Sequence, residues 1–464
     1  MPLLSSLSLL ALRQQLGSYV RIWEEGAFPV KAGVAVNPLL GGDVVMGIVA
    51  RVELYHVSIP LPAPFYPSWI PGLPQAENRF TLIKVITDDG VIGYSAGTAM
   101  GRERAGLGEI LGPYLIGEEA TDIPLIQQRV REMGYLGWHN AWIEPAFWDI
   151  KGKYAGKPVW EMLGGSPCTV QLYASTGELK TPERRIEELE QRYDEGFRAA
   201  KLRVHAFDEQ EDIRHVTETA RVLGGKMRLG VDANQAWRVT IIADAPLWDL
   251  PRAKRFAEAC ADAGLGWLEE PLPMDAYEDL ATLTALSRVP IAGGELHSAG
   301  LPELKMMIER KCYSIFQPDA TFTGGIAQSF EIAALCRQHG LAYTPHTWTN
   351  GIGFAINLHL FAASGFADTG LLEYPYNPPG WTVEGRDGLL QKPFQHQQGK
   401  ISPPDGPGLG IDIDHAALRK YGRRFFVMDK VRLAWYSIRT RGIALSREIN
   451  RIKKAKKQAS STTG

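Results

Sequence analysis

Three carboxylates follow short apolar segments in succession along the chain. Asp232 follows Leu-Gly-Val, Glu269 follows Gly-Trp-Leu, and Glu295 follows Ala-Gly-Gly. A single acid at such a place could be a helix N-cap or a surface group, but three in succession favour a shared site. Oxygen ligands without histidine or thiolate suit Mg²⁺, or alternatively Mn²⁺, better than zinc. We therefore expect these three side chains to bind one Mg²⁺ per subunit.

Two pairs of polar residues lie two positions apart near the same segments. Lys201 and Arg203 should project from one face of a strand, and so should Asp232 and Asn234. The two cations could form structural salt bridges inside the protein, but beside a metal we favour a role in holding an anionic substrate. Asn234 is expected to contact the substrate.

A carboxylate and an imidazole follow two later segments. Asp319 ends Gln-Pro-Asp, and His346 follows Thr-Pro. If their strands are adjacent, Asp319 can bind one imidazole nitrogen and raise the basicity of the other, which is the arrangement of a general base. A lone histidine would more often be structural, but the paired aspartate and the nearby acids favour catalysis. Glu373 follows the next segment and could face the substrate as a hydrogen-bond donor or as a charge.

Eight short apolar segments alternate with helical patterns and would position these groups. They are residues 170–173, 200–204, 227–231, 265–268, 290–292, 313–316, 341–343 and 371–372. Eight strand–helix units predict an α/β fold with a modified (β/α)₈ barrel. Alternating strands at 48–55, 80–86 and 91–94 and a helical stretch ending near Gly165 predict an N-terminal α+β capping domain.

The expected domain organisation has five parts. Residues 1–47 form an N-terminal extension, 48–165 the capping domain, 166–390 the barrel, 391–427 a segment returning to the cap, and 428–464 a basic tail. The tail reads as a solvated helix or frayed end that catalysis does not need. The aromatic residues of the proline-rich loop, Phe65, Tyr66 and Trp69, are expected to shape the substrate pocket, or else to pack against the barrel.

The composition is that of an ordinary globular protein. Hydrophobic residues make up 45%, charged residues 22%, and the formal net charge is −2. This balance gives no field that would attract nucleic acid or an anionic membrane, so a small-molecule substrate is expected. Four cysteines without CxxC spacing indicate a reducing cytoplasm. No apolar run is long enough to span a membrane, and no Lys or Arg precedes the apolar N-terminus as in a signal peptide.

Residues 48–379 resemble the enolase superfamily, specifically its mandelate racemase subgroup. The resemblance rests on motifs in one order: residues 146–153 and 158–165, Lys201-Leu-Arg203, Asp232-Ala-Asn234, Glu269-Glu-Pro, Gly-Gly-Glu295, Gln-Pro-Asp319, Pro-His346 and Glu373-Tyr-Pro. It implies a capped barrel that binds Mg²⁺ through Asp232, Glu269 and Glu295. It also implies abstraction of the proton α to a substrate carboxylate through a metal-stabilised enediolate, and a homo-oligomer is expected.

Arg203 departs from the pattern of relatives that carry a second lysine as a base. A guanidinium stays protonated, so Arg203 is a poor proton acceptor. Asn234 stands where some relatives place a histidine, which leaves His346 as the one good base. One base suffices for dehydration, whereas racemisation needs groups on both faces. We therefore expect an acid-sugar dehydratase, with a racemase or epimerase of an α-hydroxy acid and an inactive metal- and carboxylate-binding protein as alternatives.

Overall fold

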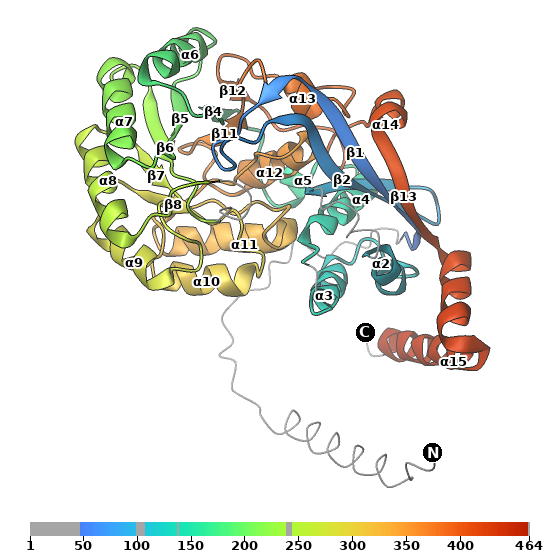
Figure 1. Cartoon of the computed structure of the whole chain (residues 1–464). Helices are drawn as coiled ribbons and strands as arrows, with labels where there is room; N and C mark the ends of the chain where they lie inside the picture. Colours follow the sequence, from blue (N-terminus) through green and yellow to red (C-terminus); the bar gives the residue numbers. More distant parts are fainter. Residues whose placement is uncertain (1–46, 99–106, 137–138, 238–243, 463–464) are drawn as a thin grey trace, which may run out of the picture. The chain divides into compact units, whose positions relative to one another are not determined.

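An antiparallel sheet in the order β13-β1-β2-β3 forms the cap in the computed structural model, which describes residues 47–98, 107–136, 139–237 and 244–462 (Figure 1). Its strands are β1 (Val49–Phe65), β2 (Gln75–Thr87), β3 (Ile92–Thr98) and β13 (Gly422–Asp429). The last of these comes from the end of the chain and pairs with the first half of β1. The expected N-terminal extension, apart from Gly47, lies outside the described residues.

Strand β1 continues further than expected, through the prolines that we had assigned to a loop. Its pairing with β13 ends at Val57, so beyond that residue β1 is a sheet edge on one side. Proline lacks an N–H and is tolerated at such an edge. On the other side β2 follows β1 as far as the pair Phe65 and Gln75, with an irregular register after Pro60. The extended strand therefore carries the aromatic loop toward the barrel.

Helices at the cap-to-barrel junction include α2 (Leu107–Leu115), α3 (Ile123–Gly134), the 3₁₀ helix η3 (Ala141–Ile143), α4 (Pro145–Ala155) and α5 (Val159–Met162). Glu144, between η3 and α4, reaches the first turn of α11 (Gly325–Gln338), where its carboxylate accepts from the N–H of Ile326 at 2.8 Å and of Ala327 at 3.2 Å. A carboxylate at a helix N-terminus satisfies otherwise unpaired N–H groups. This contact joins the cap to the barrel.

Eight parallel strands form the barrel sheet in the order β10-β9-β8-β7-β6-β5-β4-β11. They are β4 (Val170–Ser175), β5 (Ala199–Arg203), β6 (Arg228–Asp232), β7 (Trp267–Glu269), β8 (Ile291–Gly293), β9 (Ile315–Phe316), β10 (Ala342–Tyr343) and β11 (Leu372–Pro375). Each overlaps one predicted segment, which confirms the predicted barrel. Between β10 and β11, the Thr344 hydroxyl donates to the Leu371 carbonyl at 2.6 Å. The short strand β12 (Lys400–Ile401) pairs antiparallel with β4.

Helices alternate with these strands and surround them (Figure 1). They are α6 (Pro182–Asp194), α7 (Glu209–Leu223), α8 (Leu250–Asp262), α9 (Tyr277–Leu286), α10 (Leu301–Glu309), α11 and α12 (Gly351–Ala363), followed by α13 (Val383–Asp387), α14 (His415–Tyr421) and α15 (Lys430–Thr462). Among the described residues, no helix is both long and apolar enough to cross a bilayer. Because strands β4 to β11 are parallel, their carboxyl ends share one face, where the predicted residues should meet.

Candidate active site

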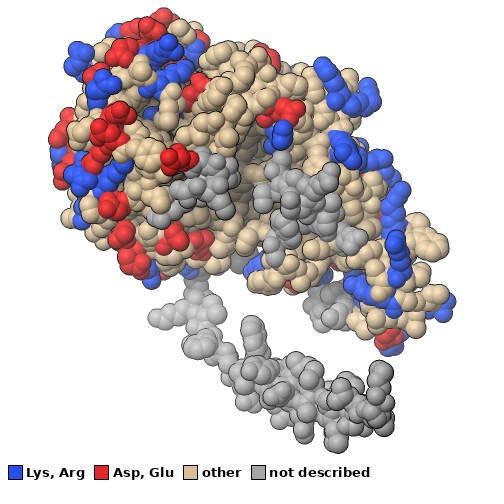
Figure 2. All heavy atoms as spheres, in the orientation of Figure 1, with Lys and Arg blue, Asp and Glu red and all other residues tan. Residues whose placement is uncertain are grey.

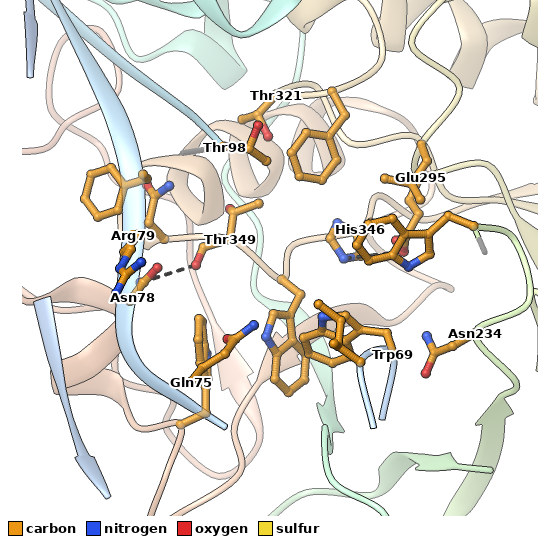
Figure 3. A pocket seen from close by; sticks show the side chains of 18 of the residues that line it. Trp69, Gln75, Asn78, Arg79, Thr98, Asn234, Glu295, Thr321, His346 and Thr349 are labelled. Atoms are coloured by element: carbon orange, nitrogen blue, oxygen red, sulfur yellow. Dashed lines mark hydrogen bonds and ion pairs between the residues drawn. The ribbon is translucent and has the colours of Figure 1, made fainter. Parts of the chain in front are cut away.

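A cavity of about 1000 Å³ lies where residues of the cap and the barrel strand ends meet. Figure 3 shows Asn234, Glu295 and His346 on one side of it and Gln75, Asn78 and Arg79 of β2 on the other. Its size is at the upper end of the roughly 300–1000 Å³ common for small-molecule sites. Residues of the cap therefore line one side of the cavity, and the barrel strand ends form its floor.

Two of the three predicted metal carboxylates, Asp232 and Glu269, are bonded to the two predicted cations. The third, Glu295, lines the cavity and contacts His346. Lys201 Nζ lies 2.5 Å from Glu269 Oε1 and 3.5 Å from Asp232 Oδ2. The Arg203 guanidinium donates to Asp232 Oδ2. The two cations and their two carboxylate partners are almost fully buried. As it stands, no set of three acidic, histidine or cysteine side chains in the described residues is spaced to hold a metal ion. For a metal to bind, Lys201 and Arg203 would have to lose contacts with Asp232 and Glu269.

The charges around this floor nevertheless fit a divalent cation. Glu270 is buried with neither carboxylate oxygen hydrogen-bonded, and burial together with the negative charges of Glu295 and Asp232 raises its pKa well above the usual value. Burial likewise raises the pKa of Glu269 to about 7. The two permanent cations Lys201 and Arg203 lie among five buried or partly buried carboxyl groups: Asp232, Glu269, Glu270, Glu295 and Glu373. This excess of oxygen ligands and negative charge suits a hard cation.

His346 and Asp319 are in contact as expected. His346 Nδ1 lies 3.0 Å from Asp319 Oδ2, and the other oxygen of Asp319 accepts from Thr321 and from Asn357. The second imidazole nitrogen, Nε2, lies 3.4 Å from Glu295 Oε2. Burial favours a neutral imidazole, but the charges of Glu295 and Glu373 and the bond to Asp319 outweigh it and raise the pKa of His346 to about 9. The geometry is that of an oriented, strongly basic imidazole.

Glu373 is a charged hydrogen-bond acceptor in this structure, which corresponds to the second of the two expected roles, donor or charge. Its carboxylate lies 2.8 Å from Lys201 Nζ and accepts from the Ser175 hydroxyl at 2.8 Å and the Thr347 N–H at 2.7 Å. Burial opposes its charge, but Lys201 and His346 outweigh burial and hold the pKa of Glu373 well below the usual range. Donors already occupy this carboxylate, so it keeps its negative charge and fixes Lys201.

Arg203 is held rigidly at the wall of the cavity. Its guanidinium carbon lies 5.4 Å from the ring centre of Trp69 and 5.3 Å from that of Trp348, within range of cation–π interactions. Its Nε donates to the Thr176 carbonyl at 2.6 Å. Burial disfavours its charge, but Asp232 and the other carboxylates raise the pKa of Arg203 further. Arg203 therefore cannot accept a proton, as predicted from its residue type.

Sequence reasoning missed Ser68 and His205, which fasten the aromatic loop to the barrel. The Ser68 hydroxyl donates to Asn234 Oδ1 at 2.7 Å, its N–H donates to the Gly177 carbonyl at 2.8 Å, and its carbonyl lies 2.6 Å from His205 Nδ1. We call these three contacts the Ser68 latch. Strand alternation could have placed His205 beside Lys201 and Arg203, whereas no local pattern marks Ser68.

The latch also orients Asn234. Its amide oxygen accepts from Ser68 and, at 3.4 Å, from Arg203 Nη1, and two donors on one atom identify that atom as oxygen. The amide nitrogen is then the group left for other partners, and Asn234 lines the cavity. This arrangement agrees with the expected place of Asn234 beside Asp232, whose Oδ1 accepts the Asn234 N–H at 2.8 Å.

Of the three aromatic residues expected in the pocket, the structure places only Trp69 there. Trp69 lines the cavity, whereas Phe65 and Tyr66 are not among its described lining residues. Phe65 is fully buried against Trp348 and Trp381, and 51% of the Tyr66 side chain is exposed to solvent. Alternation at the end of β1 explains why Phe65 is buried and Tyr66 is exposed, since neighbouring residues point to opposite sides. For Phe65 the packing alternative was therefore correct.

Two family models match the chain. Residues 184–417, half of the chain, match the model "Enolase C-terminal domain-like", and residues 58–164 match "Mandelate racemase / muconate lactonizing enzyme, N-terminal domain". Among curated proteins, the chain is 28% identical to D-galactarolactone cycloisomerase of Agrobacterium fabrum, over 75% of this chain and 93% of that protein. It is 27% identical to arabinonate dehydratase of Saccharolobus solfataricus, over 76% and 93%.

Solved structures show the same relationship. The crystal structure of L-talarate/galactarate dehydratase from Salmonella typhimurium, liganded with Mg and L-lyxarohydroxamate, matches with a TM-score of 0.70 and 25% identity, over 83% of this chain and 95% of that one. The 3,6-anhydro-D-galactonate cycloisomerase from Zobellia galactanivorans matches with a TM-score of 0.68 and 25% identity, over 81% and 99%. With both domains matched in order, this chain belongs to the mandelate racemase/muconate lactonizing enzyme group of the enolase superfamily.

Proposed function

We propose that the protein is a Mg²⁺-dependent hydro-lyase that removes water from an acid sugar. Asp232, Glu269 and Glu295 would hold the cation, and Lys201 would lie beside the substrate carboxylate. When bound, the cation supplies positive charge opposite the second negative charge that develops on that carboxylate. Lys201 contributes a further positive charge: burial opposes that charge, but the charges of Glu269 and Glu373 outweigh burial and raise the pKa of Lys201 well above its usual value.

His346 carries the proton transfer in this proposal. Its Nε2 takes the α-proton, the β-carbon–oxygen bond breaks, and the same imidazole returns the proton to the departing hydroxyl as water. The resulting enol tautomerises to a 2-keto-3-deoxy acid. The relatives named dehydratases and the Mg-liganded neighbour support this reaction class.

The observation that carries the proposal is the asymmetry of the site. The site holds a histidine oriented by Asp319, and its other candidate group is Arg203, which lies beside Trp69 and Trp348. Racemisation needs an acid–base group on each face, and Arg203 cannot serve as one. Elimination needs only one.

A second candidate keeps the same proton removal but changes the leaving group. Two similar proteins are named cycloisomerases, and loss of a ring oxygen instead of a hydroxyl would open a cyclic sugar acid without releasing water. Trp69, which lies beside Arg203, offers a flat apolar surface on which a sugar ring could stack.

The test is a panel of open-chain and cyclic sugar acids incubated with Mg²⁺ in D₂O. Keto-acid formation with loss of water supports the dehydratase, and ring opening at constant mass supports the cycloisomerase. Deuterium at the α-carbon with inversion and no elimination would indicate a racemase. Bound Mg²⁺ without exchange or turnover across the panel would contradict the proposed activity and favour the inactive binding protein.

A further inference from the structure

The C-terminal helix α15 lies beyond the part of the chain that the family models match, which ends at residue 417. Gly442 has non-helical dihedral angles (φ 79°, ψ 166°) and divides α15 into two segments. Between Lys430 and Thr462 the sequence has ten Lys or Arg residues and one acid, Glu448. Figure 2 shows blue side chains along the surface formed by β13 and α15.

The first segment of α15 exposes a row of apolar side chains. Val431, Trp435 and Ile438 are four and three positions apart, so they share one helix face, and 67%, 69% and 38% of them, respectively, is exposed. We call these three residues the apolar stripe. Leu433, on the opposite face, packs against the hydrophobic core. The helix therefore already has a face toward the body of the protein, and the apolar stripe is a second face.

Basic residues flank the apolar stripe on both sides. At 100° per residue, Arg432 and Arg439 fall on one side of it, and Lys430 and Arg441 fall on the other. An apolar stripe between basic flanks is typical of helices that lie in the plane of an anionic bilayer, where apolar side chains enter the acyl boundary and long cationic side chains reach the headgroups.

The positive charge of α15 favours some possible binding partners of the apolar stripe over others. Two copies of so basic a helix would repel each other, which disfavours a second copy of the chain. Nucleic acid would use the charges and could stack on Trp435, but it would leave Val431 and Ile438 exposed. From this pattern we propose that the first segment of α15 docks the protein on anionic phospholipid membranes. The tail was expected to be a solvated helix or a frayed end, but solvation alone does not account for the apolar stripe.

Vesicle co-sedimentation of the full-length protein tests this inference. The probes are vesicles of phosphatidylcholine containing a quarter phosphatidylglycerol, and vesicles of phosphatidylcholine alone. We expect binding to the first, little binding to the second, and release at about 1 M salt, where the Debye length is about 3 Å. Arg439→Glu with Arg441→Glu should weaken binding at least tenfold, since each basic residue near such a surface contributes about fivefold.

A triple variant tests the stripe itself. Val431→Ser, Trp435→Ser and Ile438→Ser should abolish vesicle binding, whereas Leu286→Ser, at an exposed leucine of α9, should not. Both variants should keep the catalytic activity of the parent, because neither changes the cavity. Equal binding to neutral vesicles, no binding by the parent, or a change of oligomeric state in the triple variant without any vesicle binding would overturn the inference.

Discussion

His346 Nδ1 lies 3.0 Å from Asp319 Oδ2, and both residues are buried beneath the cavity. Asp319 is itself held by the backbone N–H of Thr321 at 2.7 Å and the side-chain amide of Asn357 at 2.8 Å. These two hydrogen bonds fix the position of the Asp319 carboxylate independently of its contact with His346. This pair orients Nε2 toward Glu295 and the cavity, where a substrate proton would have to be.

His346→Asn should abolish turnover and α-proton exchange together. No other described side chain that lines the cavity near Glu295 is a comparable base, and general acid–base catalysis contributes typically 10²–10⁴-fold. Exchange of the α-proton in D₂O, followed by NMR with saturating Mg²⁺, measures the effect. Asp319→Asn, as the matched change, should slow exchange without eliminating it. Continued exchange in His346→Asn would rule out this histidine as the sole base.

Arg203→Lys should leave elimination as the reaction and slow it by about tenfold. Lysine loses the guanidinium contacts with the Trp69 and Trp348 rings and at least one charge-assisted hydrogen bond, worth about 1.5–3 kcal/mol. Lys201→Met should cost far more, since it removes the charge beside three carboxylates. Chiral analysis of recovered substrate checks the prediction. If the parent formed substrate of inverted configuration and Arg203→Lys did not, Arg203 would be an acid–base group, and the proposal would be wrong on this point.

The strand ends were predictable because their signal is local. An apolar segment followed by an acid is visible in the sequence, and alternation correctly paired Lys201 with Arg203 and Asp232 with Asn234 on shared faces. The contact between Asp319 and His346 followed from the order of the strands. Each of these inferences needed only the barrel topology.

Contacts between the cap and the barrel were not predictable in the same way. Ser68 is 166 residues from Asn234, and Glu144 is 182 residues from Ile326, so no period or spacing connects them. The course of β1 through its prolines depends on where β13 stops pairing, which is also a long-range fact. The sequence left two places open for Phe65 for that reason, because the direction of its side chain depends on the register of a strand that the sequence predicted as a loop.

Mg²⁺ should stabilise the protein, and the effect should depend on Glu295. A ligand at a hundred times its Kd adds about 2.7 kcal/mol to the free energy of unfolding. Thermal unfolding of chelator-treated protein, with and without Mg²⁺, measures it. Glu295→Gln should lose the Mg²⁺-dependent shift in Tm.

Glu270→Gln is the matched control for that experiment. It should keep the Mg²⁺-dependent shift, because Glu270 is not expected to be a ligand. It should change the Tm of the metal-free protein little, because the amide replaces a buried carboxyl group of the same shape that has a raised pKa and no hydrogen-bond partner. If Glu270→Gln abolished the shift and Glu295→Gln did not, the assignment of ligands would be wrong.

Ser68→Ala should lower kcat/KM about tenfold by releasing the latch. The change removes a buried hydrogen bond to Asn234, and unpaired buried groups cost about 1–3 kcal/mol. Asn234 and Trp69 would both lose their fixed positions, so kcat should fall and KM should rise. Ser68→Thr keeps the hydroxyl and should restore most of the activity. Equal losses in both variants would indicate a packing defect instead of a lost hydrogen bond.

Stability should fall in mild acid because of His359, which joins α12 to two distant segments. Its Nδ1 accepts from the Trp160 N–H at 3.3 Å, and its Nε2 lies 3.0 Å from the Leu409 carbonyl. Protonation would place a second N–H against the Trp160 donor. Burial is the main cause that lowers the pKa of His359 to about 4, despite the bond to Leu409.

The sign follows from the direction of that shift. The unfolded chain takes up a proton near pH 6.5 and the folded one only near pH 4, so stability is complete above about 6.5 and is lost as the pH falls toward 4. The loss is on the order of 3 kcal/mol. Urea unfolding at several pH values, with NMR titration of the imidazole, measures it. His359→Phe should be less stable than the parent at neutral pH, because the Trp160 N–H loses its acceptor, and the gap should narrow in acid. A His359 resonance that titrates near pH 6.5 would contradict this account.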